Sequence, residues 1–373
     1  MEQYDVVVVG LGVMGAAAAW SATKRGASVL AVDANPENHV LGSSHGKTRA
    51  TRESYFESPE YVPLAQSAHA LWRQLEGEAQ TSLLTMNGGA YLGPPDHPVL
   101  AGVRKAAEEH GLDLEVYAPD EMMALHPGFR MPKDWQGLIE RTSGVLRAEA
   151  CLNAFRATAK QRGAELRFET PMRSWRPTEH GVIVELSSGP LLAGKLILTL
   201  GPWAVEGLAD LGLPIHGRRV TVAHFETIRP EDYANDTLGV FFWAADMGVY
   251  GGFQHIDGQG VKLLRHDDGG ACTPDTIQRE VTADDIRAFT DFSYIHLPGV
   301  GDQVKEAYTC IYTMTPDDHF IIDHHPASRD IVYATGFSGH GFKFAPVIGE
   351  ILADLSLTGG TEHPIGFLHA NRF

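Results

Sequence analysis

The glycine pattern near the amino terminus restricts the folds open to this chain more than any other feature. Residues 4–10 form a short apolar run, which is typical of a strand buried on both faces of a parallel sheet. The motif Gly10-Leu-Gly12-Val-Met-Gly15 follows, and small residues at helical spacing then predict a helix over residues 13–25 that ends at Gly26. Residues 28–33 read as the next strand. Together these segments predict one βαβ unit with a right-handed crossover, and hence a doubly wound sheet around it.

Each glycine of the motif has its own task in such a unit. Gly10 allows a tight turn, Gly12 lets backbone amides approach a pyrophosphate, and Gly15 lets the helix pack closely. The pyrophosphate would lie at the positive end of the helix. Asp33 ends the second strand, where a carboxylate accepts hydrogen bonds from ribose hydroxyls and disfavours a ribose phosphate. The motif therefore predicts NAD or FAD rather than NADP, and it does not distinguish the first two.

The rest of the chain predicts a second domain. Helical patterns at 61–75 and 148–162 alternate with strand-like segments at 166–170, 182–186 and 195–199. Residues 218–265 are rich in Val, Thr, Phe and Tyr, which favours a mainly antiparallel sheet. The chain closes with a strand at 330–335, a glycine-rich turn through Gly341 and a helix at 344–355.

Both ends of the chain thus carry strand, loop and helix patterns, so we expect a discontinuous Rossmann-like domain. The predicted fold class is α/β, with a second domain built on the antiparallel sheet. We assign residues 1–80, 146–217 and 322–373 to the dinucleotide-binding domain, and residues 81–145 and 218–321 to the substrate domain.

Charge and cysteine content narrow the classes of function. The 373 residues carry 30 Lys and Arg against 47 Asp and Glu, and the net charge of −17 disfavours nucleic acid and anionic membranes as partners. The three cysteines, Cys151, Cys272 and Cys310, lack the spacing of a zinc site or a disulfide framework. The chain begins with acid where a signal peptide carries base, and the apolar stretch 6–20 is glycine-broken and too short for a bilayer. We expect a cytoplasmic protein without a metal site.

Three further segments accompany the glycine motif and its Val-Asp33-Ala strand end. They are Gly42-Ser-Ser-His45-Gly46-Lys-Thr48-Arg49-Ala-Thr-Arg52, then Cys310-Ile-Tyr312-Thr-Met-Thr-Pro316-Asp317-Asp-His319-Phe-Ile-Ile-Asp323, and Gly336-Phe-Ser-Gly339-His340-Gly341-Phe-Lys343-Phe. In order and separation, over the whole chain, the four segments resemble the monomeric sarcosine oxidase and N-methyltryptophan oxidase family of flavoproteins. The resemblance implies FAD as the cofactor and a monomer.

The resemblance also implies how the flavin is held. Cys310 would form a covalent thioether to the flavin ring, although its position alone reads as a buried small hydrophobe. The loop residues Ser43, His45 and Thr48 would belong to the cofactor site. Amides of the turn containing Gly339 and Gly341 would stabilise negative charge on the reduced ring.

Four cationic side chains would each have a separate role in such a site. Arg52 and Lys343 would bind the substrate carboxylate, for which an arginine fork is well suited because its parallel N–H donors match two oxygens. Arg49 would lie over one face of the flavin. Lys262, by resemblance, would activate oxygen, since a fixed cation in a dry site stabilises superoxide. Without the flanking motif, Arg49 and Arg52 read as a pair of surface arginines and Lys262 as a lysine on a strand. A surface position suits Lys343 poorly, because a cation opposes the dipole at the start of a helix.

Three further residues match family positions that line the substrate cavity: Tyr250, Tyr312 and His266. Core packing is a serious alternative for the two tyrosines. The sequence departs from the family pattern at Ser44, Glu53, Ser54 and Leu264, and residues 250–255 contain an extra residue in a segment that usually reads Tyr-Gly-Phe-Pro. These departures put sarcosine itself in doubt as the substrate.

The predicted function is an FAD-dependent oxidase of a secondary amino acid, N-methyl, N-alkyl or cyclic, which gives an imine or aldehyde and hydrogen peroxide. Four alternatives remain open at this point. They are a flavin-dependent amino-acid dehydrogenase that uses another acceptor, an oxidase of glycated amino acids or pipecolate, an NAD-dependent dehydrogenase, and a non-catalytic or RNA-modifying dinucleotide-binding module.

Overall fold

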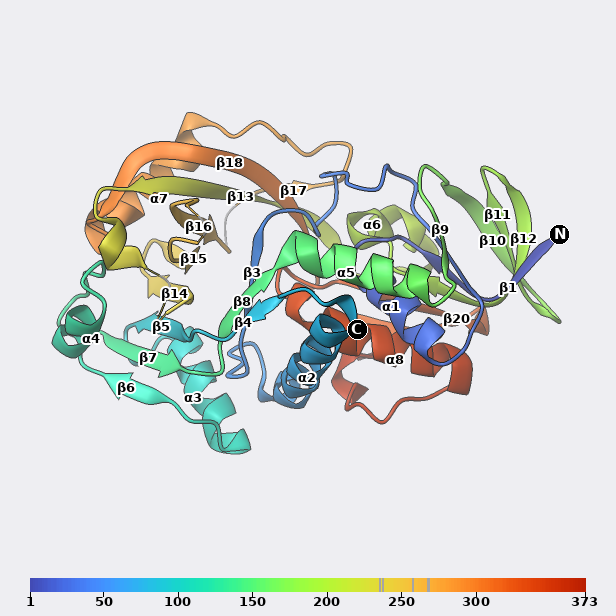
Figure 1. The fold of residues 1–373 in the computed structure, drawn as a ribbon, viewed down its shortest axis with the longest axis horizontal. Helices are drawn as coiled ribbons and strands as arrows, with labels where there is room; N and C mark the ends of the chain where they lie inside the picture. Colours follow the sequence, from blue (N-terminus) through green and yellow to red (C-terminus); the bar gives the residue numbers. More distant parts are fainter. Residues whose placement is uncertain (235, 237, 257, 267–268) are drawn as a thin grey trace.

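Two large sheets lie at opposite ends of an elongated molecule, with helices packed mainly around one of them (Figure 1). The computed structural model describes residues 1–234, 236, 238–256, 258–266 and 269–373. The predicted α/β fold class, with a Rossmann-like domain beside a mainly antiparallel sheet, is confirmed by this arrangement. The proposed boundaries between the domains stay a prediction.

The first sheet contains eight strands among the described residues, and its centre is parallel. Its order is β10-β11-β12-β1-β2-β9, with β20 paired to β12 and β19 paired to β20. Strand β1 runs parallel to both β12 and β2, as a βαβ unit requires. Val6, Val7 and Val8 are fully buried, which accounts for the continuous apolar run. The strands are β1 (Glu2–Val9), β2 (Val29–Val32), β9 (Glu165–Arg167), β10 (Met172–Thr178), β11 (Gly181–Leu186), β12 (Gly189–Leu198), β19 (Ile321–His325) and β20 (Ser328–Thr335).

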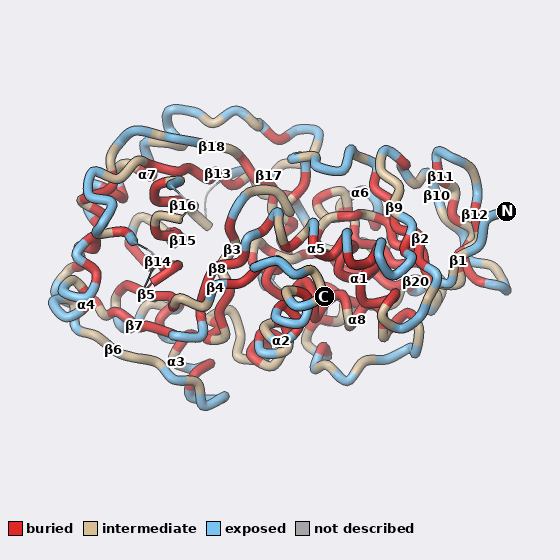
Figure 2. The backbone as a smooth tube through the Cα atoms, viewed as in Figure 1, coloured by how far each residue is buried: buried red, intermediate tan, exposed pale blue. Residues whose placement is uncertain are grey.

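Helices bury the first sheet, and α1 (Val13–Lys24) is the most enclosed of them (Figure 2). It packs against α8 (Ala345–Thr358) and α5 (Ala148–Gln161), while α2 (Val62–Ala79) lies against α5 and α8. A Cβ on Gly349 would lie 2.5 Å from the backbone of Ala17, so a glycine is needed where α8 crosses α1. This packing brings the carboxyl-terminal segment back to the glycine turn.

The second sheet has the order β17-β13-β16-β15-β14-β5-β7-β6, and β18 pairs with β13. Its pairs are antiparallel except for β14 with β5. One face packs on α7 (Ala283–His296), where the ring of Tyr250 stacks on Phe292 with centroids 4.1 Å apart. The strands are β5 (Gly89–Gly93), β6 (Glu115–Tyr117), β7 (Gln136–Glu140), β13 (His216–Thr227), β14 (Val240–Ala245), β15 (Gly248–Phe253), β16 (Val261–Arg265), β17 (Ala271–Cys272) and β18 (Val300–Met314).

A small third sheet lies between the two halves (Figure 1). It joins β3 (Thr48–Thr51), β8 (Gly144–Arg147) and β4 (Leu84–Thr85). The loop that precedes β3 is tied to the second sheet, because the Ser43 hydroxyl donates to the carbonyl of Ile311 at 2.6 Å. The loop thereby lies between the two domains.

Most elements expected from the sequence are present. The helix predicted at 61–75 extends four residues further, to Ala79, where Gln80 caps it in a left-handed conformation. The strand predicted at 166–170 is shorter, since β9 ends at Arg167. No helix was predicted between 81 and 145, where α3 (Pro98–His110) and α4 (Pro119–Leu125) lie, and α7 was not predicted either. None of the described helices is long and apolar enough to cross a bilayer.

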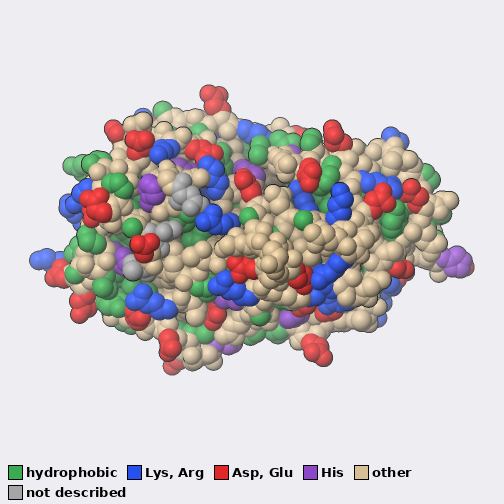
Figure 3. Space-filling view, in the orientation of Figure 1, with side chains coloured by type: hydrophobic (Ala, Val, Ile, Leu, Met, Phe, Trp, Pro, Cys, Tyr) green, Lys and Arg blue, Asp and Glu red, His purple; other side chains and the backbone are tan. Residues whose placement is uncertain are grey.

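Positive and negative side chains alternate over the face of the molecule in Figure 3. No broad area of one sign occupies the described part of that face.

Candidate active site

A cavity of about 840 Å³ runs from the glycine turn to the second sheet. Gly15, Thr48 and Tyr250 are not among the described residues that line it. The predicted site residues that do line it are Gly10, Gly12, Asp33, Ser43, His45, Arg49, Arg52, Lys262, His266, Cys310, Tyr312, Gly339, Gly341 and Lys343.

The glycine turn at one end has the geometry expected of it. Gly10 adopts φ +94°, and a Cβ there would lie 2.3 Å from the carbonyl oxygen of Thr199. A Cβ on Gly15 would lie 1.7 Å from the Gly10 carbonyl oxygen, so Gly15 acts behind the cavity wall by letting α1 approach the turn. Gly12 faces the cavity at the start of α1. The positive helix end therefore points into the cavity.

Asp33 lies where β2 meets the glycine turn. One carboxylate oxygen accepts from the Leu11 amide at 2.8 Å and the other from the Asn35 amide at 2.9 Å. Arg156 was not anticipated: its guanidinium donates to the Leu11 carbonyl at 2.6 Å and the Glu37 carbonyl at 2.7 Å. These two side chains fix the backbone around the nucleotide end of the cavity.

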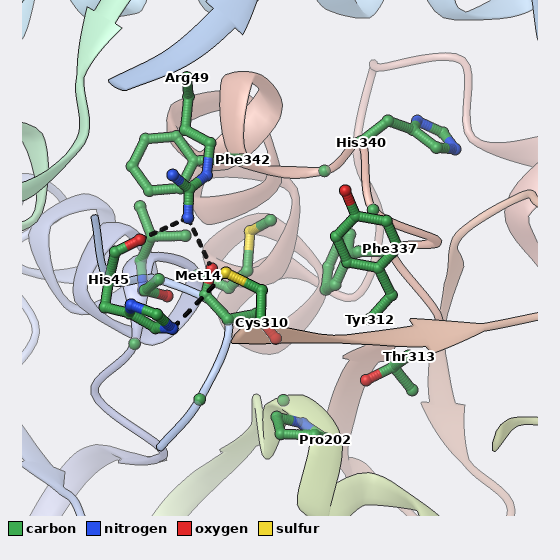
Figure 4. A pocket seen from close by; sticks show the side chains of 18 of the residues that line it. Met14, His45, Arg49, Pro202, Cys310, Tyr312, Thr313, Phe337, His340 and Phe342 are labelled. Carbon is green, nitrogen blue, oxygen red and sulfur yellow. Dashed lines mark hydrogen bonds between the residues drawn. The ribbon is translucent and has the colours of Figure 1, made fainter. Parts of the chain in front are cut away.

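His45, from the loop before β3, and Arg49, on β3 itself, lie near Cys310 (Figure 4). Arg49 donates to the carbonyl oxygens of Ser43 at 3.1 Å and His45 at 2.6 Å. Its guanidinium carbon lies 5.3 Å from the ring centroid of Phe342. Cys310 Sγ lies 3.6 Å from His45 Nε2. A thiol, an imidazole and a guanidinium are thus gathered on one wall.

Burial decides the charge state of this group. It raises the pKa of the Cys310 thiol, an effect that the charges of Arg49 and Lys262 oppose. Burial, reinforced by the charge of Arg49, lowers the pKa of His45 to about 4. His45 is therefore a neutral imidazole at neutral pH, able to accept a proton.

Lys262 is buried on β16, and it has two oxygen partners from a single residue. Its ammonium donates to the Thr48 carbonyl at 2.9 Å and the Thr48 hydroxyl at 3.1 Å. It also lies 4.5 Å from the ring centroid of Phe253. Burial and the charge of Arg49 hold its pKa well below the ordinary value. Thr48 thus contributes by anchoring this amine rather than by lining the cavity.

At the other end, Arg52 is enclosed by aromatic rings and paired with Glu57. Its guanidinium carbon lies 3.8 Å from the ring centroid of Tyr55 and 4.1 Å from that of Phe56. Nη2 donates to both Glu57 oxygens, at 2.7 and 2.6 Å. Arg52 Nε is buried, and none of the described residues accepts its hydrogen. This residue keeps a buried donor for a further acceptor.

Lys343 lies near Arg52, in the short turn just before α8. Its ammonium donates to the Tyr55 hydroxyl at 3.1 Å and the His340 carbonyl at 2.7 Å. The Tyr55 hydroxyl is also 2.6 Å from Nδ1 of His340. Burial and the charge of Arg52 hold the pKa of Lys343 well below the ordinary value, while Glu57 opposes that shift. An incoming anion would stabilise the charged form of the amine.

The aromatic residues that line the cavity come from several elements, including Tyr312 on β18, Phe242 on β14 and Phe253 on β15. Tyr312 packs on Gly339, which adopts φ +80°, and a Cβ there would lie 2.3 Å from the Tyr312 ring. His266 lies 6.3 Å from Tyr312 and 6.5 Å from Phe242, measured between ring centroids.

The expectation for Tyr250 needs correction. This side chain lies on the face of β15 that packs on α7, where its hydroxyl donates to the Ala288 carbonyl at 3.3 Å. Successive side chains of a strand point to opposite faces, so the neighbours Val249 and Gly251 face the cavity instead.

Glu140 was not predicted as a site residue, although it holds the backbone of the segment that follows Arg52. It is fully buried on β7 and accepts from the amides of Glu53 at 2.6 Å and Ser54 at 3.2 Å. The Tyr91 and Thr142 hydroxyls donate to it as well, at 2.9 and 2.8 Å. Nothing local in the sequence marks this carboxylate, because its backbone partners are 86 and 87 residues away.

The lining fits a flavin dinucleotide. The glycine turn offers a backbone cradle that side chains at Gly10 or Gly15 would obstruct, and the helix end behind it favours a pyrophosphate. The cavity continues from there past apolar walls, including Met14 and Phe342, to the buried cations. An adenine nucleotide at one end and a ring system beside Cys310 are the groups that this shape accommodates.

Comparisons with known proteins agree with this geometry. A family model described as FAD dependent oxidoreductase matches residues 5–355. A monomeric sarcosine oxidase of Streptomyces avermitilis is 40% identical over 380 residues, covering 99% of this chain and 97% of that protein. An N-methyl-L-tryptophan oxidase of Salmonella arizonae is 34% identical over 359 residues, covering 95% of each chain.

The fold also has close counterparts among solved structures. NikD, described as an unusual amino acid oxidase essential for nikkomycin biosynthesis, matches with a TM-score of 0.88 and 24% identity, covering 99% of this chain and 98% of that one. At this level of identity the likeness concerns the fold alone.

Proposed function

This chain belongs to the family of FAD-dependent oxidoreductases, and from that we propose that it oxidises a secondary amino acid, N-methyl, N-alkyl or cyclic, with oxygen as the acceptor. The observation that carries the proposal is the pair of buried cations, Arg52 and Lys343, at the end of the dinucleotide cavity opposite the glycine turn. The names of the relatives, which are oxidases of sarcosine and N-methyl-L-tryptophan, support it.

The two cations would hold the substrate by its carboxylate. Arg52 has an enclosed guanidinium with one N–H still without a partner, and charge-assisted bonds of this kind orient a carboxylate strongly. Lys343 adds a second positive charge from the turn before α8. Glu57 already shares the guanidinium, so the substrate carboxylate would complete or replace that pair. The amine would then lie toward Tyr312 and His266.

FAD, when bound, supplies the oxidant that takes two electrons and a hydrogen from the carbon next to the substrate nitrogen, and passes the electrons on to oxygen. The residues of this chain orient the amine and keep the reacting carbon away from water. The positive charges of the buried Lys262 and the half-buried Arg49 would lie where oxygen is reduced to peroxide, and would stabilise negative charge there. No side chain has to act as a general base in this scheme.

We also propose that Cys310 bonds covalently to the flavin. The thiol would lose its proton, the sulfur would bond to a ring methyl carbon in place of one hydrogen, and the two electrons would pass to the flavin ring and then to oxygen. The supporting observation is the position of the thiol, whose Sγ lies 3.6 Å from Nε2 of His45 on the cavity wall that also carries Arg49. Arg49 and Lys262 would stabilise the thiolate so formed. The word monomeric in the names of the sarcosine oxidase relatives supports a monomer, which size-exclusion chromatography tests. A cytoplasmic location stays a prediction of the sequence.

The direct test of the proposed function is to purify the yellow protein and to follow oxygen uptake and peroxide with N-methyl amino acids, pipecolate and glycated amino acids. Peroxide in proportion to the oxygen consumed supports the proposal. Reduction of an artificial electron acceptor without peroxide would instead assign a flavin-dependent dehydrogenase. A colourless protein that does not bind added FAD would exclude both the oxidase and the flavin-dependent dehydrogenase.

A further inference from the structure

The face of the second sheet that lines the cavity carries one residue without a side chain at its centre. Gly251 on β15 lies directly opposite Phe242 on β14 and Leu264 on β16. All three line the cavity. Side chains at directly opposed positions of neighbouring strands lie on the same face. Only a shallow depression is therefore left in the sheet at Gly251, since His266 Nε2 and Leu264 Cγ lie 3.3 and 3.4 Å from the position of a Cβ there.

The local backbone does not require a glycine at this position. Gly251 is outside the left-handed region, unlike Gly248 on the same strand. A Cβ on Gly251 would lie 3.3 Å from Nε2 of His266 and 3.4 Å from Cγ of Leu264, so a small side chain could be tolerated. Gly252, in contrast, cannot be replaced by a residue with a side chain, because a Cβ there would lie 2.1 Å from the ring of Phe241. A glycine within a strand that needs none for its own geometry marks a close approach by something else.

The surroundings of the depression are hydrocarbon except for the imidazole of His266, whose Nε2 would lie 3.3 Å from a Cβ on Gly251. Val240 precedes Phe242 on the same face of β14, and Val249 precedes Gly251 on the same face of β15. We define the Gly251 socket as five residues: Val240, Phe242, Val249, Gly251 and Leu264. His266 lies at its edge. An apolar lining of this kind binds hydrocarbon rather than polar groups.

The Gly251 socket lies beside the guanidinium that is proposed to hold the substrate. The guanidinium carbon of Arg52 is 5.5 Å from the ring centroid of Phe242. The same Phe242 ring stacks on Tyr91, at 5.3 Å between centroids, which fixes its orientation. A ligand with its carboxylate on Arg52 would therefore place the atoms next to that carboxylate against the socket.

We propose that the Gly251 socket receives a bulky apolar group of the substrate, so that the substrate is a secondary amino acid with a branched, aromatic or ring hydrocarbon group. Gly251 is the residue that sets this specificity. Sarcosine, which carries only a methyl group on its nitrogen, would leave the socket unfilled and be a poor substrate. The inference rests on the proposed function in one respect, namely that Arg52 holds a carboxylate.

The test measures binding of two carboxylates that cannot be oxidised as amines, acetate and 3-phenylpropionate. The dissociation constants are read from the perturbation of the flavin spectrum of the FAD-loaded protein. In the unaltered protein, 3-phenylpropionate should bind at least roughly tenfold more tightly than acetate. The reason is that each methylene group buried in a fitted apolar site increases affinity severalfold. In Gly251→Val, where the side chain fills the socket, that ratio should fall by about tenfold.

Further variants separate filling of the socket from damage to the fold. Gly251→Ala fills less of the space and should lower the ratio only severalfold. Leu264→Ala widens the socket and should preserve or raise the preference for the larger ligand. Gly77→Ala is a matched control, because a Cβ at this helix position meets nothing within 4 Å, and it should change neither dissociation constant.

Turnover gives a second readout. The unaltered protein should oxidise N-methyl-L-phenylalanine with a higher kcat/KM than sarcosine, and Gly251→Val should reverse that order. A ratio of dissociation constants near one in the unaltered protein would overturn the inference, as would an unchanged ratio in a folded Gly251→Val protein. Failure of every secondary amine to reduce the flavin, with the binding ratio intact, would instead reject the proposed function.

Discussion

The guanidinium of Arg52 donates to both carboxylate oxygens of Glu57 through the same nitrogen, at 2.7 and 2.6 Å, and both side chains line the cavity. Burial acts to raise the pKa of Glu57, but the positive charge of Arg52 overcomes it and lowers that pKa to about 2. A buried charge held in this way depends on its partner.

The pair predicts a specific dependence of stability on pH. Because the pKa of Glu57 is about 2 in the folded protein and 4.5 ordinarily, the unfolded chain binds more protons between these values. The contribution of Glu57, roughly 3 kcal/mol at most, is complete above pH 4.5 and is lost as the pH falls toward 2. Between about pH 5 and about pH 3, the free energy of unfolding should fall less in Glu57→Gln than in the unaltered protein. Denaturant titration at each pH measures this difference. An equal loss in both proteins would contradict the ion pair.

Glu140 should act on substrate binding without touching the substrate. Glu140→Gln replaces one acceptor oxygen by an amide donor, so one of the Glu53 and Ser54 amides loses its partner. We expect KM for the best amino-acid substrate to rise by about tenfold while kcat changes less than about twofold, because Arg52 is displaced but the flavin is not. Tyr91→Phe, which removes one donor and leaves both amides bound, should have the smaller effect on KM. Equal loss of kcat and of kcat/KM would refute this positioning role.

Gly339 should not tolerate alanine. The residue combines φ +80° with a ring carbon of Tyr312 at 2.3 Å from the position of a Cβ. Gly339→Ala should therefore lose about 2 kcal/mol or more of stability and displace the Tyr312 ring from the cavity wall. Gly360→Ala, at a position where a Cβ meets nothing within 4 Å, is the control. Thermal unfolding of the two variants measures the difference, and equal midpoints would show that the turn adapts.

Cys310 should keep the flavin attached after denaturation. When the purified protein is precipitated with acid, the yellow colour should remain in the pellet, and in Cys310→Ala it should move to the supernatant. Cys151→Ala is a matched control, because that buried thiol faces the carbonyl of Leu83 and is not among the described cavity-lining residues. Colour in the supernatant of the unaltered protein would disprove the covalent bond while leaving FAD binding intact.

The nucleotide end of the cavity was predictable because its requirements are local. A strand, a turn with φ +94° at Gly10 and a helix that must approach it at Gly15 leave a pattern within six residues of sequence. The cations Arg49, Arg52 and Lys343 were located through motifs that surround them closely in the sequence. The βαβ unit and the closing helix were found for the same reason.

Relations between distant strands were not predictable in the same way. Whether Tyr250 or Gly251 faces the cavity depends on the phase of β15 against its neighbours, and a shift of one residue exchanges the two faces. The bracing of Arg52 by Glu140 and the contact of Lys262 with Thr48 join segments separated by 86 or more residues. No single segment of the sequence carries a sign of such pairs.

The proposed oxidation of a secondary amino acid can be tested by separating the two half-reactions of the FAD-loaded protein. Mixed without air with an N-methyl amino acid, the protein should lose its visible flavin absorbance, and admission of air should restore that absorbance with release of peroxide. Lys262→Met should leave the first step nearly unchanged and slow the second strongly, because a buried cation is lost where negative charge forms on oxygen. An absorbance that no secondary amino acid bleaches, or one that air does not restore in the unaltered protein, would contradict the account.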